Sequence, residues 1–141
     1  MKRLHHIGVL THDIAKTVEY YNTLYGEMNW SYDESCHFPQ ECLDVGYEFT
    51  IKSAHGNAGD FVIELIQPLA GENSYLWKAT DERTGLHHIA YMYDSETERR
   101  ADIDKLVAQG FTIVHAAERL PGHGTHYLVA PDNSVVFELK C

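Results

Sequence analysis

The chain has 141 residues, of which 44% are hydrophobic and 23% charged, a composition typical of a folded globular protein. Asp and Glu outnumber Lys and Arg by 21 to 11, and the resulting net charge of −10 argues against a nucleic-acid partner, because phosphate binding requires a basic face. The sequence shows no apolar run long enough for a membrane span and no secretory leader, so we expect a cytoplasmic protein without a membrane partner.

The first half of the chain predicts one helix among four strands. After the capping residue Asp13, apolar side chains recur at helical spacing at Ile14, Val18, Tyr21 and Leu24. Gly26 is suited to end that helix. A turn-rich run at 55–60 separates the last two strands, and Pro68 is expected to end the final one. The expected bounds are 4–10 for the first strand, 13–24 for the helix, and 29–35, 45–52 and 61–67 for the remaining strands.

The second half predicts the same order of elements. Its helix should bury Ile103, Leu106 and Val107, while the charged run at 94–100 reads as a capped, solvated helix start. A short helix at 72–78 is expected between the halves, and a flexible loop is expected at 120–124. The expected bounds are 86–93 for the first strand, 96–109 for the helix, and 111–115, 125–130 and 134–140 for the other strands.

Sequence motifs also repeat between the two halves. The opening Leu4-His5-His6-Ile7 returns as Leu86-His87-His88-Ile89. Each half then closes on an apolar strand that contains one carboxylate, Glu64 in the first and Glu138 in the second. The repeat predicts two copies of one βαβββ unit, at about 1–70 and 84–141, within a single domain spanning 1–141.

Alternation along a strand selects which of these side chains face together. If the apolar neighbours of Glu64 and Glu138 cover the helices, both carboxylates lie on the opposite, concave side of the sheet. Within each His-His pair only one imidazole should share that side. Because His5 and His87 are in phase with the apolar residues of their strands, we choose His6 and His88.

Two imidazoles and two carboxylates on one concave surface suit a divalent metal ion. Glutamates placed together repel unless a proton or a cation lies between them. Zn, Co, Ni, Mn or Fe would accept His6, Glu64, His88 and Glu138 as ligands and keep two positions open for water or substrate oxygens. The alternative is a set of four buried polar residues that satisfy one another.

These features resemble the vicinal oxygen chelate superfamily over nearly the whole chain. The resemblance rests on strands that open in His-Ile, on the run Gly85-Leu86-His87-His88-Ile89-Ala90, on Glu-Leu strands and on a Pro-Asp turn before the last strand. It implies an α+β fold in which two tandem βαβββ modules form a cupped, barrel-like mixed sheet. Within the superfamily the chain is most similar to methylmalonyl-CoA epimerase and glyoxalase I, which implies His6, Glu64, His88 and Glu138 as metal ligands.

The resemblance also implies a metal-dependent isomerase or lyase that removes a proton next to a carbonyl. Its substrate would be a small oxo acid, a CoA thioester or a hemithioacetal, and a homodimer is expected. Glu138 is our choice for the catalytic base, and Glu48 is a second candidate that also reads as a solvent-facing strand residue.

Two other functions remain open on the same fold. An extradiol-type dioxygenase would hold Fe(II) through His6, His88 and Glu138, leaving Glu64 surplus. A drug-binding protein would need a pocket and no metal. Among the other histidines, His37 and His55 read as ordinary surface residues; His123 and His126 flank a loop, where they could contact substrate or simply be exposed.

Overall fold

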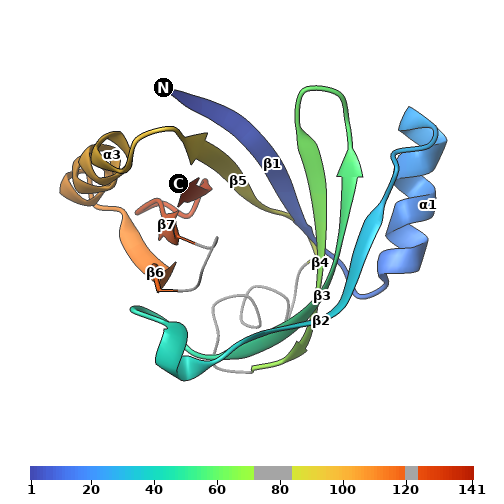
Figure 1. The fold of residues 1–141 in the computed structure, drawn as a ribbon, viewed down its shortest axis with the longest axis horizontal. Helices are drawn as coiled ribbons and strands as arrows, with labels where there is room; N and C mark the ends of the chain where they lie inside the picture. Colours follow the sequence, from blue (N-terminus) through green and yellow to red (C-terminus); the bar gives the residue numbers. More distant parts are fainter. Residues whose placement is uncertain (72–83, 120–123) are drawn as a thin grey trace.

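A computed structural model describes residues 1–71, 84–119 and 124–141. The expected helix at 72–78 and the expected loop as far as His123 lie outside this range. The described strands form one sheet in the order β2-β3-β4-β1-β5-β8-β7-β6 (Figure 1). Their bounds are β1 Lys2–Leu10, β2 Ser31–Phe38, β3 Phe49–Asn57, β4 Val62–Ala70, β5 Gly85–Tyr93, β6 Thr112–Ala117, β7 Thr125–Val129 and β8 Val136–Lys140; the helices are α1 Ile14–Tyr25, the short 3₁₀ helix η1 Gln40–Cys42, and α3 Glu96–Ala108.

The two halves of the chain have the same topology. In the first half β1 pairs in parallel with β4, while β3 joins β4 and β2 in antiparallel fashion. In the second half β5, β8, β7 and β6 repeat this pattern. The halves meet where β1 pairs antiparallel with β5 in the middle of the sheet. The predicted α+β fold of two βαβββ modules is therefore confirmed.

The sheet curls into a cup with both long helices on its outer side (Figure 1). Backbone hydrogen bonds connect the segment before β3 to β6, at the opposite end of the sheet. The backbone of Ala116 in β6 accepts a hydrogen bond from Asp44 N at 2.9 Å and donates to Val45 O at 3.1 Å. The segment before β3 thus bridges to the opposite end of the sheet and brings the two halves around one interior.

Helix α1 lies against the first half of the sheet. Asp13 caps it by accepting from Lys16 N, and Gly26 follows its end with φ of +79°, as predicted. Ile14 and Val18 pack with apolar residues of the strands, among them Val9, Ile63 and Leu65, in the core beneath the helix. Leu24, which the helical spacing placed on the apolar stripe, is instead 77% exposed because it lies in the last turn, beyond that core.

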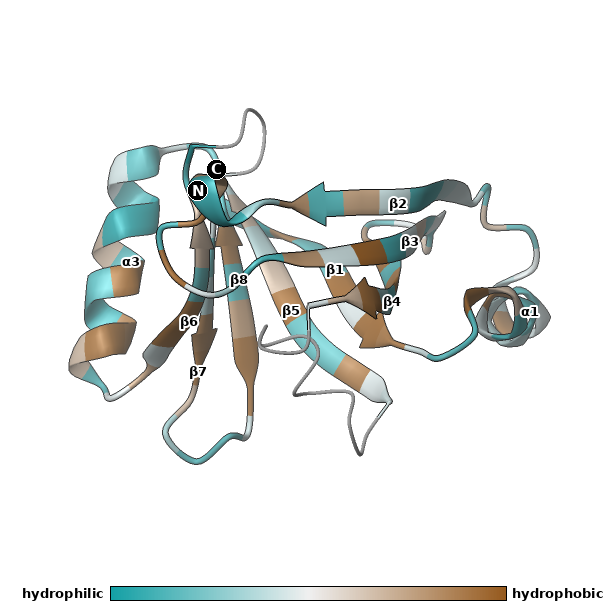
Figure 2. Cartoon of the chain, turned by 90° about the horizontal axis from the view of Figure 1, so that it is seen from below, coloured by the Kyte–Doolittle hydropathy of each residue, from teal (hydrophilic) through white to brown (hydrophobic). Residues whose placement is uncertain are grey.

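Helix α3 covers the second half, with Ser95 as its N-cap. Ile103 is buried and Leu106 packs beside it, but Val107 is exposed, contrary to the prediction. Arg99 was predicted to lie in a solvated helix start, but its side chain is fully buried. The reason is that Arg99 and Ile103 are four residues apart and therefore share the face that meets the sheet. Figure 2 shows the alternation of hydrophilic and hydrophobic residues around this helix.

Three strands of the first half, β2, β3 and β4, end later than predicted. β2 extends to Phe38 and β3 runs from Phe49 to Asn57, because the two strands pair with each other along this length. β4 continues through Pro68, where the register with β3 shifts and β1 no longer pairs. A missing N–H costs little at such a position, which is where a strand tolerates proline.

No helix among the described residues is long and apolar enough to cross a membrane.

Candidate metal centre

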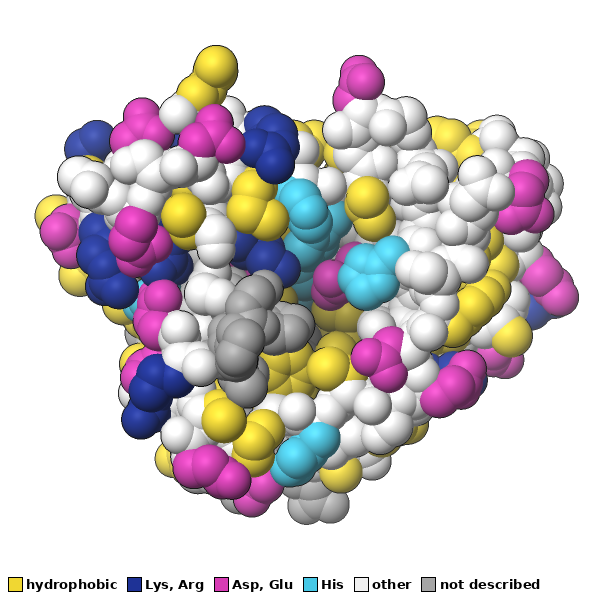
Figure 3. Space-filling view, in the orientation of Figure 1, with side chains coloured by type: hydrophobic (Ala, Val, Ile, Leu, Met, Phe, Trp, Pro, Cys, Tyr) yellow, Lys and Arg dark blue, Asp and Glu magenta, His cyan; other side chains and the backbone are white. Residues whose placement is uncertain are grey.

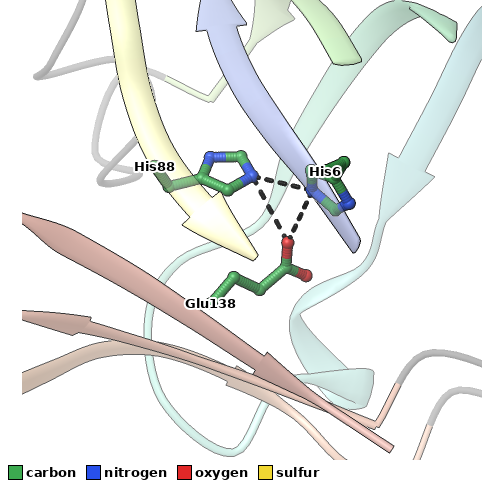
Figure 4. A group of neighbouring side chains, drawn as sticks. All are labelled: His6, His88 and Glu138. Atoms are coloured by element: carbon green, nitrogen blue, oxygen red, sulfur yellow. Dashed lines mark hydrogen bonds and ion pairs between the residues drawn. The ribbon is translucent and has the colours of Figure 1, made fainter. Parts of the chain in front are cut away.

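Three predicted site residues converge at the centre of the sheet. His6 comes from β1, His88 from β5 and Glu138 from β8, so the junction of the two halves brings together residues far apart in the chain (Figure 4). His6 Nε2 lies 3.0 Å from His88 Nε2 and 3.0 Å from Glu138 Oε2, and His88 Nε2 lies 3.3 Å from the same oxygen. All three residues are buried, and one ligand atom of each falls within 4.8 Å of the others.

Glu64, the fourth predicted ligand, lies beside this group in a looser arrangement. Its carboxylate oxygens are 3.4 Å from His6 Nε2 and 4.0 Å from His88 Nε2. The oxygen nearer to His6 also lies 3.0 Å from His55 Nε2. His55, read from the sequence as an ordinary surface residue, therefore contacts the candidate centre from β3.

The first histidine of each pair also lies next to the site. His5 Nδ1 is 2.7 Å from His6 Nδ1, and His87 Nδ1 is 2.7 Å from His88 Nδ1. Strand alternation predicted that each first histidine would point to the other face. Instead, the register between β1 and β5 skips His5 and His87, so each occupies an irregular position where adjacent rings can meet.

Gly8 gives His88 the room to enter the centre. A Cβ built on Gly8 would lie 2.0 Å from His88 Cε1 and 2.5 Å from its Nε2. No side chain can be accommodated there while the imidazole keeps its place. A glycine at position 8 is therefore required for His88 to occupy its place in the site.

The charges of the centre depend on one another. Burial lowers the pKa of His6, but the neighbouring carboxylates of Glu138 and Glu64 outweigh it, so the net shift is upward. Burial raises the pKa of Glu64, but hydrogen bonding from His55 and the charges of His6 and His88 bring it to about 2. Contacts with His6 and His88 likewise outweigh burial and hold the pKa of Glu138 well below its usual value. Both carboxylates are therefore ionised at neutral pH.

One oxygen in this cluster has no hydrogen-bond partner. Glu138 Oε1 accepts from Thr125 Oγ1 at 2.7 Å, whereas the buried Oε2 accepts from no group among the described residues. His88 Nε2 and Glu138 Oε2 both lie 3.0 Å from His6 Nε2. The hydrogen bond of His6 Nε2 is made with His88 Nε2 and not with this oxygen. A buried anionic oxygen beside two imidazole nitrogens is a donor set that fits a divalent metal ion.

The centre opens into a cavity of about 290 Å³ inside the cup. Figure 3 shows a hollow where histidine, acidic and basic side chains surround a hydrophobic floor. His115 lies in its wall, and burial lowers the pKa of this imidazole to about 4, so it is neutral. The described lining consists of Ser31, Tyr32, Asp33, Cys36, Phe38, Phe49, Ile51, Ser53, His55, Glu64, Ile66, His115, Thr125, Tyr127, Glu138 and Lys140.

The other predicted residues lie elsewhere. Glu48 is exposed, 3.7 Å from the exposed His37, and is absent from the cavity lining. His126 is a buried strand residue rather than a loop histidine, and its Nδ1 lies 2.7 Å from Glu118 Oε1. No sequence pattern pointed to His55, His115 or Lys140, because their position in the cavity depends on how the sheet curls.

Solved structures of similar fold cover almost the whole chain. A hypothetical protein from Bacillus halodurans is 23% identical, with a TM-score of 0.66 over 98% of this chain and 92% of that one. Methylmalonyl-CoA epimerase from Mycobacterium tuberculosis is 22% identical, with a TM-score of 0.56 and coverage of 96% and 85%. The Streptomyces coelicolor methylmalonyl-CoA epimerase in complex with 2-nitronate-propionyl-CoA is 25% identical, with a TM-score of 0.59 and coverage of 97% and 94%.

Sequence comparison assigns the family. No curated protein matches the chain in sequence. However, residues 5–129 match the sequence model of the glyoxalase/bleomycin resistance protein/dioxygenase superfamily. This range includes both His-His pairs and Glu64 and covers most of the chain. The chain therefore belongs to the glyoxalase/bleomycin resistance protein/dioxygenase superfamily, which is the vicinal oxygen chelate superfamily.

Proposed function

We propose that this protein is a metal-dependent isomerase or lyase that abstracts a proton next to a carbonyl group. The observation that carries the proposal is the buried Glu138 Oε2, which has no hydrogen-bond partner among the described residues and faces two imidazole nitrogens. The superfamily and the epimerases among its structural neighbours support this reaction class. The candidate substrates are a small oxo acid, a CoA thioester or a hemithioacetal.

His6, His88, Glu138 and Glu64 would hold the ion, which is Zn, Co, Ni, Mn or Fe. A divalent metal bound there supplies Lewis-acid stabilisation for negative charge on the oxygens of the substrate. Glu64 and Glu138 neutralise its charge, and their ionised state at neutral pH suits this role. His55 holds one oxygen of Glu64 and so limits the rotation of that carboxylate.

Glu138 is the proposed proton acceptor. The C–H bond next to the carbonyl breaks, its electron pair moves toward the carbonyl oxygen, and the proton goes to the Glu138 carboxylate. Return of the proton to carbon completes an isomerisation without any oxidant or reductant. Thr125 holds Oε1 of Glu138 at 2.7 Å, which orients the carboxylate toward the cavity. Glu48 is a poorer choice because it is exposed and does not line this cavity.

An Fe(II) dioxygenase is the second candidate, because one observation favours it. The tight group consists of two histidines and one carboxylate, which is the ligand set of many non-haem Fe(II) oxygenases. In that case Glu64, already paired with His55, would be dispensable for the ion. The role of Glu64 thus separates the two candidates.

Metal content and affinity test the proposal. Elemental mass spectrometry of protein purified without a chelating tag should find about one transition metal per chain. Glu138→Gln should lose it, and exposed Glu48→Gln is the matched control that should keep it. Adding metal at a hundred times its Kd to the metal-free protein should stabilise the fold by about 2.7 kcal/mol.

The outcomes discriminate among the three functions. Loss of metal in Glu64→Gln as well, with Zn, Co, Ni or Mn in the native protein, supports the isomerase or lyase. If the native protein contains iron and the Glu64→Gln variant retains it, the dioxygenase is favoured. A protein that contains no metal and takes up none on addition would contradict both, leaving the small-molecule binding protein.

We further propose that the protein is a homodimer. The superfamily resemblance supports this, as do the exposed residues of β2, which is an edge strand of the sheet. Sedimentation velocity should then give twice the mass of one chain.

A further inference from the structure

Lys140 stands out among the residues that line the cavity. It is the sole lysine or arginine in the described lining, and its side chain is only 19% exposed. It follows Glu138 by two residues in β8, so both side chains project from the same face of the strand. The cation therefore lies inside the cup beside the candidate metal centre.

No acceptor in the described part of the chain hydrogen-bonds to Lys140. Its Nζ lies 3.6 Å from Glu138 Oε1, an oxygen that already accepts from Thr125 Oγ1 at 2.7 Å. A lysine carries three donors, and burying them without acceptors is unfavourable. The side chain is thus poised to receive an acceptor from a bound molecule.

The charge of the site selects an anion. Glu64 and Glu138 together neutralise one divalent ion, so Lys140 leaves one positive charge in excess when the metal is bound. Asp33, the third acid in the described lining, is exposed and accepts a hydrogen bond from Ser35 N at 3.1 Å. A ligand with a single negative charge would complement this arrangement.

The opposite wall of the cavity is apolar and aromatic. The rings of Phe38 and Phe49 stack with centroids 4.6 Å apart, and His115 lies against both. Ile51 and Ile66 extend this wall. A cavity of about 290 Å³ accommodates a compact molecule, and the single lysine of its described lining is a poor match for the several phosphates of a CoA ester.

We propose that Lys140 recognises the carboxylate of a small 2-oxo acid whose apolar side chain lies on the Phe38–Phe49 wall. In such a molecule the carboxylate is one bond from the carbonyl, which matches the position of Lys140 next to Glu138. This inference rests on the proposed function and selects the oxo acid from its substrate candidates.

Binding of two matched probes tests the proposal. Benzoylformate is a 2-oxo acid with an aromatic side chain and no proton to abstract, and methyl benzoylformate lacks its charge. Isothermal titration of the metal-containing protein should show the acid binding at least about tenfold tighter than the ester. Lys140→Met should abolish this preference and Lys140→Arg should keep it, while exposed Lys16→Met is the control.

A second variant tests the apolar wall. Phe49→Leu should weaken benzoylformate binding but leave pyruvate, which has only a methyl group, nearly unchanged. Thermal unfolding of each variant checks that the fold is retained.

The proposal is overturned if acid and ester bind alike, if neither binds, or if Lys140→Met keeps the preference for the acid. Metal content measured on the same samples separates the two inferences. Absence of metal contradicts the proposed function, whereas a metal-loaded protein indifferent to the carboxylate contradicts only the role of Lys140.

Discussion

His5 Nδ1 lies 2.7 Å from His6 Nδ1, and His87 repeats this contact with His88 in the other half of the chain. If His6 offers its Nε2 lone pair to a metal, its Nδ1 carries the hydrogen and donates it to His5. Histidine ligands commonly donate their second ring N–H in this way, which fixes the tautomer and the ring orientation. The repeated His-His motif is then one ligand and one residue that positions it.

Replacement of His5 should show this positioning role. His5→Leu removes the acceptor and should weaken metal binding about tenfold to a hundredfold. His5→Asn has nearly the same size as the leucine variant but keeps an acceptor near the Nδ1 position, so its affinity should stay close to that of the native protein. Isothermal titration with Zn²⁺ measures both; equal losses in the two variants would contradict the role.

Gly8→Ala should remove the metal without removing the fold. The added Cβ would overlap the His88 ring, so the imidazole must leave its position at the centre. Gly124→Ala is a suitable control, since its Cβ would meet its nearest atom at an ordinary 3.5 Å. Metal content and circular dichroism check both variants, and a metal-loaded Gly8→Ala protein would show that His88 is not a ligand.

Asp102 should make stability depend on pH in the acid range. It accepts hydrogen bonds from Lys2 Nζ at 2.8 Å, Tyr93 Oη at 2.8 Å and Lys105 Nζ at 3.1 Å. The hydrogen bond from Lys2, with those from Tyr93 and Lys105, outweighs burial and lowers the pKa of Asp102 from 3.8 to about 2. Because the folded-state pKa is the lower one, this stabilisation is present above about pH 4 and is lost as the pH falls toward 2.

Asp102→Asn should therefore reduce the free energy of unfolding by about 1–2 kcal/mol at pH 7, with the difference disappearing near pH 2. Solvent screening at this side chain, which is 22% exposed, keeps the loss below the full value of the pKa shift. Urea unfolding at several pH values measures the difference, and exposed Asp104→Asn is the control on the same helix. A difference that persists at pH 2 would exclude the ionic origin.

Arg99 and Arg100 provide a matched pair for the buried ion cluster. Arg99 is fully buried, makes bidentate contacts of 2.7–2.8 Å with Glu96 and Glu118, and donates to Leu139 O at 3.2 Å. Arg99→Met removes the donor from the Leu139 carbonyl and from the partly exposed carboxylates of Glu96 and Glu118, and should cost about 1.5–3 kcal/mol. Arg100→Met, at a side chain that is 58% exposed, should cost less than about 1 kcal/mol. Chemical denaturation measures both, and similar losses would show that the buried network contributes little.

The fold was predictable because its signals are local and repeated. Apolar periodicity, the caps at Asp13 and Ser95, and the recurrence of Leu-His-His-Ile depend only on neighbouring residues. The strand bounds were less predictable, since β3 and β4 extend as far as their partners pair, even through Pro68. Arg99 was read as solvated because charge alone does not reveal that four partners enclose it, namely Glu96, Glu118, His126 and Leu139.

By itself, the sequence determined the two βαβββ modules and the choice of His6, Glu64, His88 and Glu138 as site candidates. Only the tertiary structure decided that His6, His88 and Glu138 form the tight group while Glu64 pairs with His55. It also decided that His5 and His87 turn toward their neighbours and that Lys140 enters the cavity. The physical reason is that strand alternation fixes which face a side chain takes in a regular ladder, whereas irregular register and the curl of the sheet, both set by pairing between distant strands, fix which side chains meet.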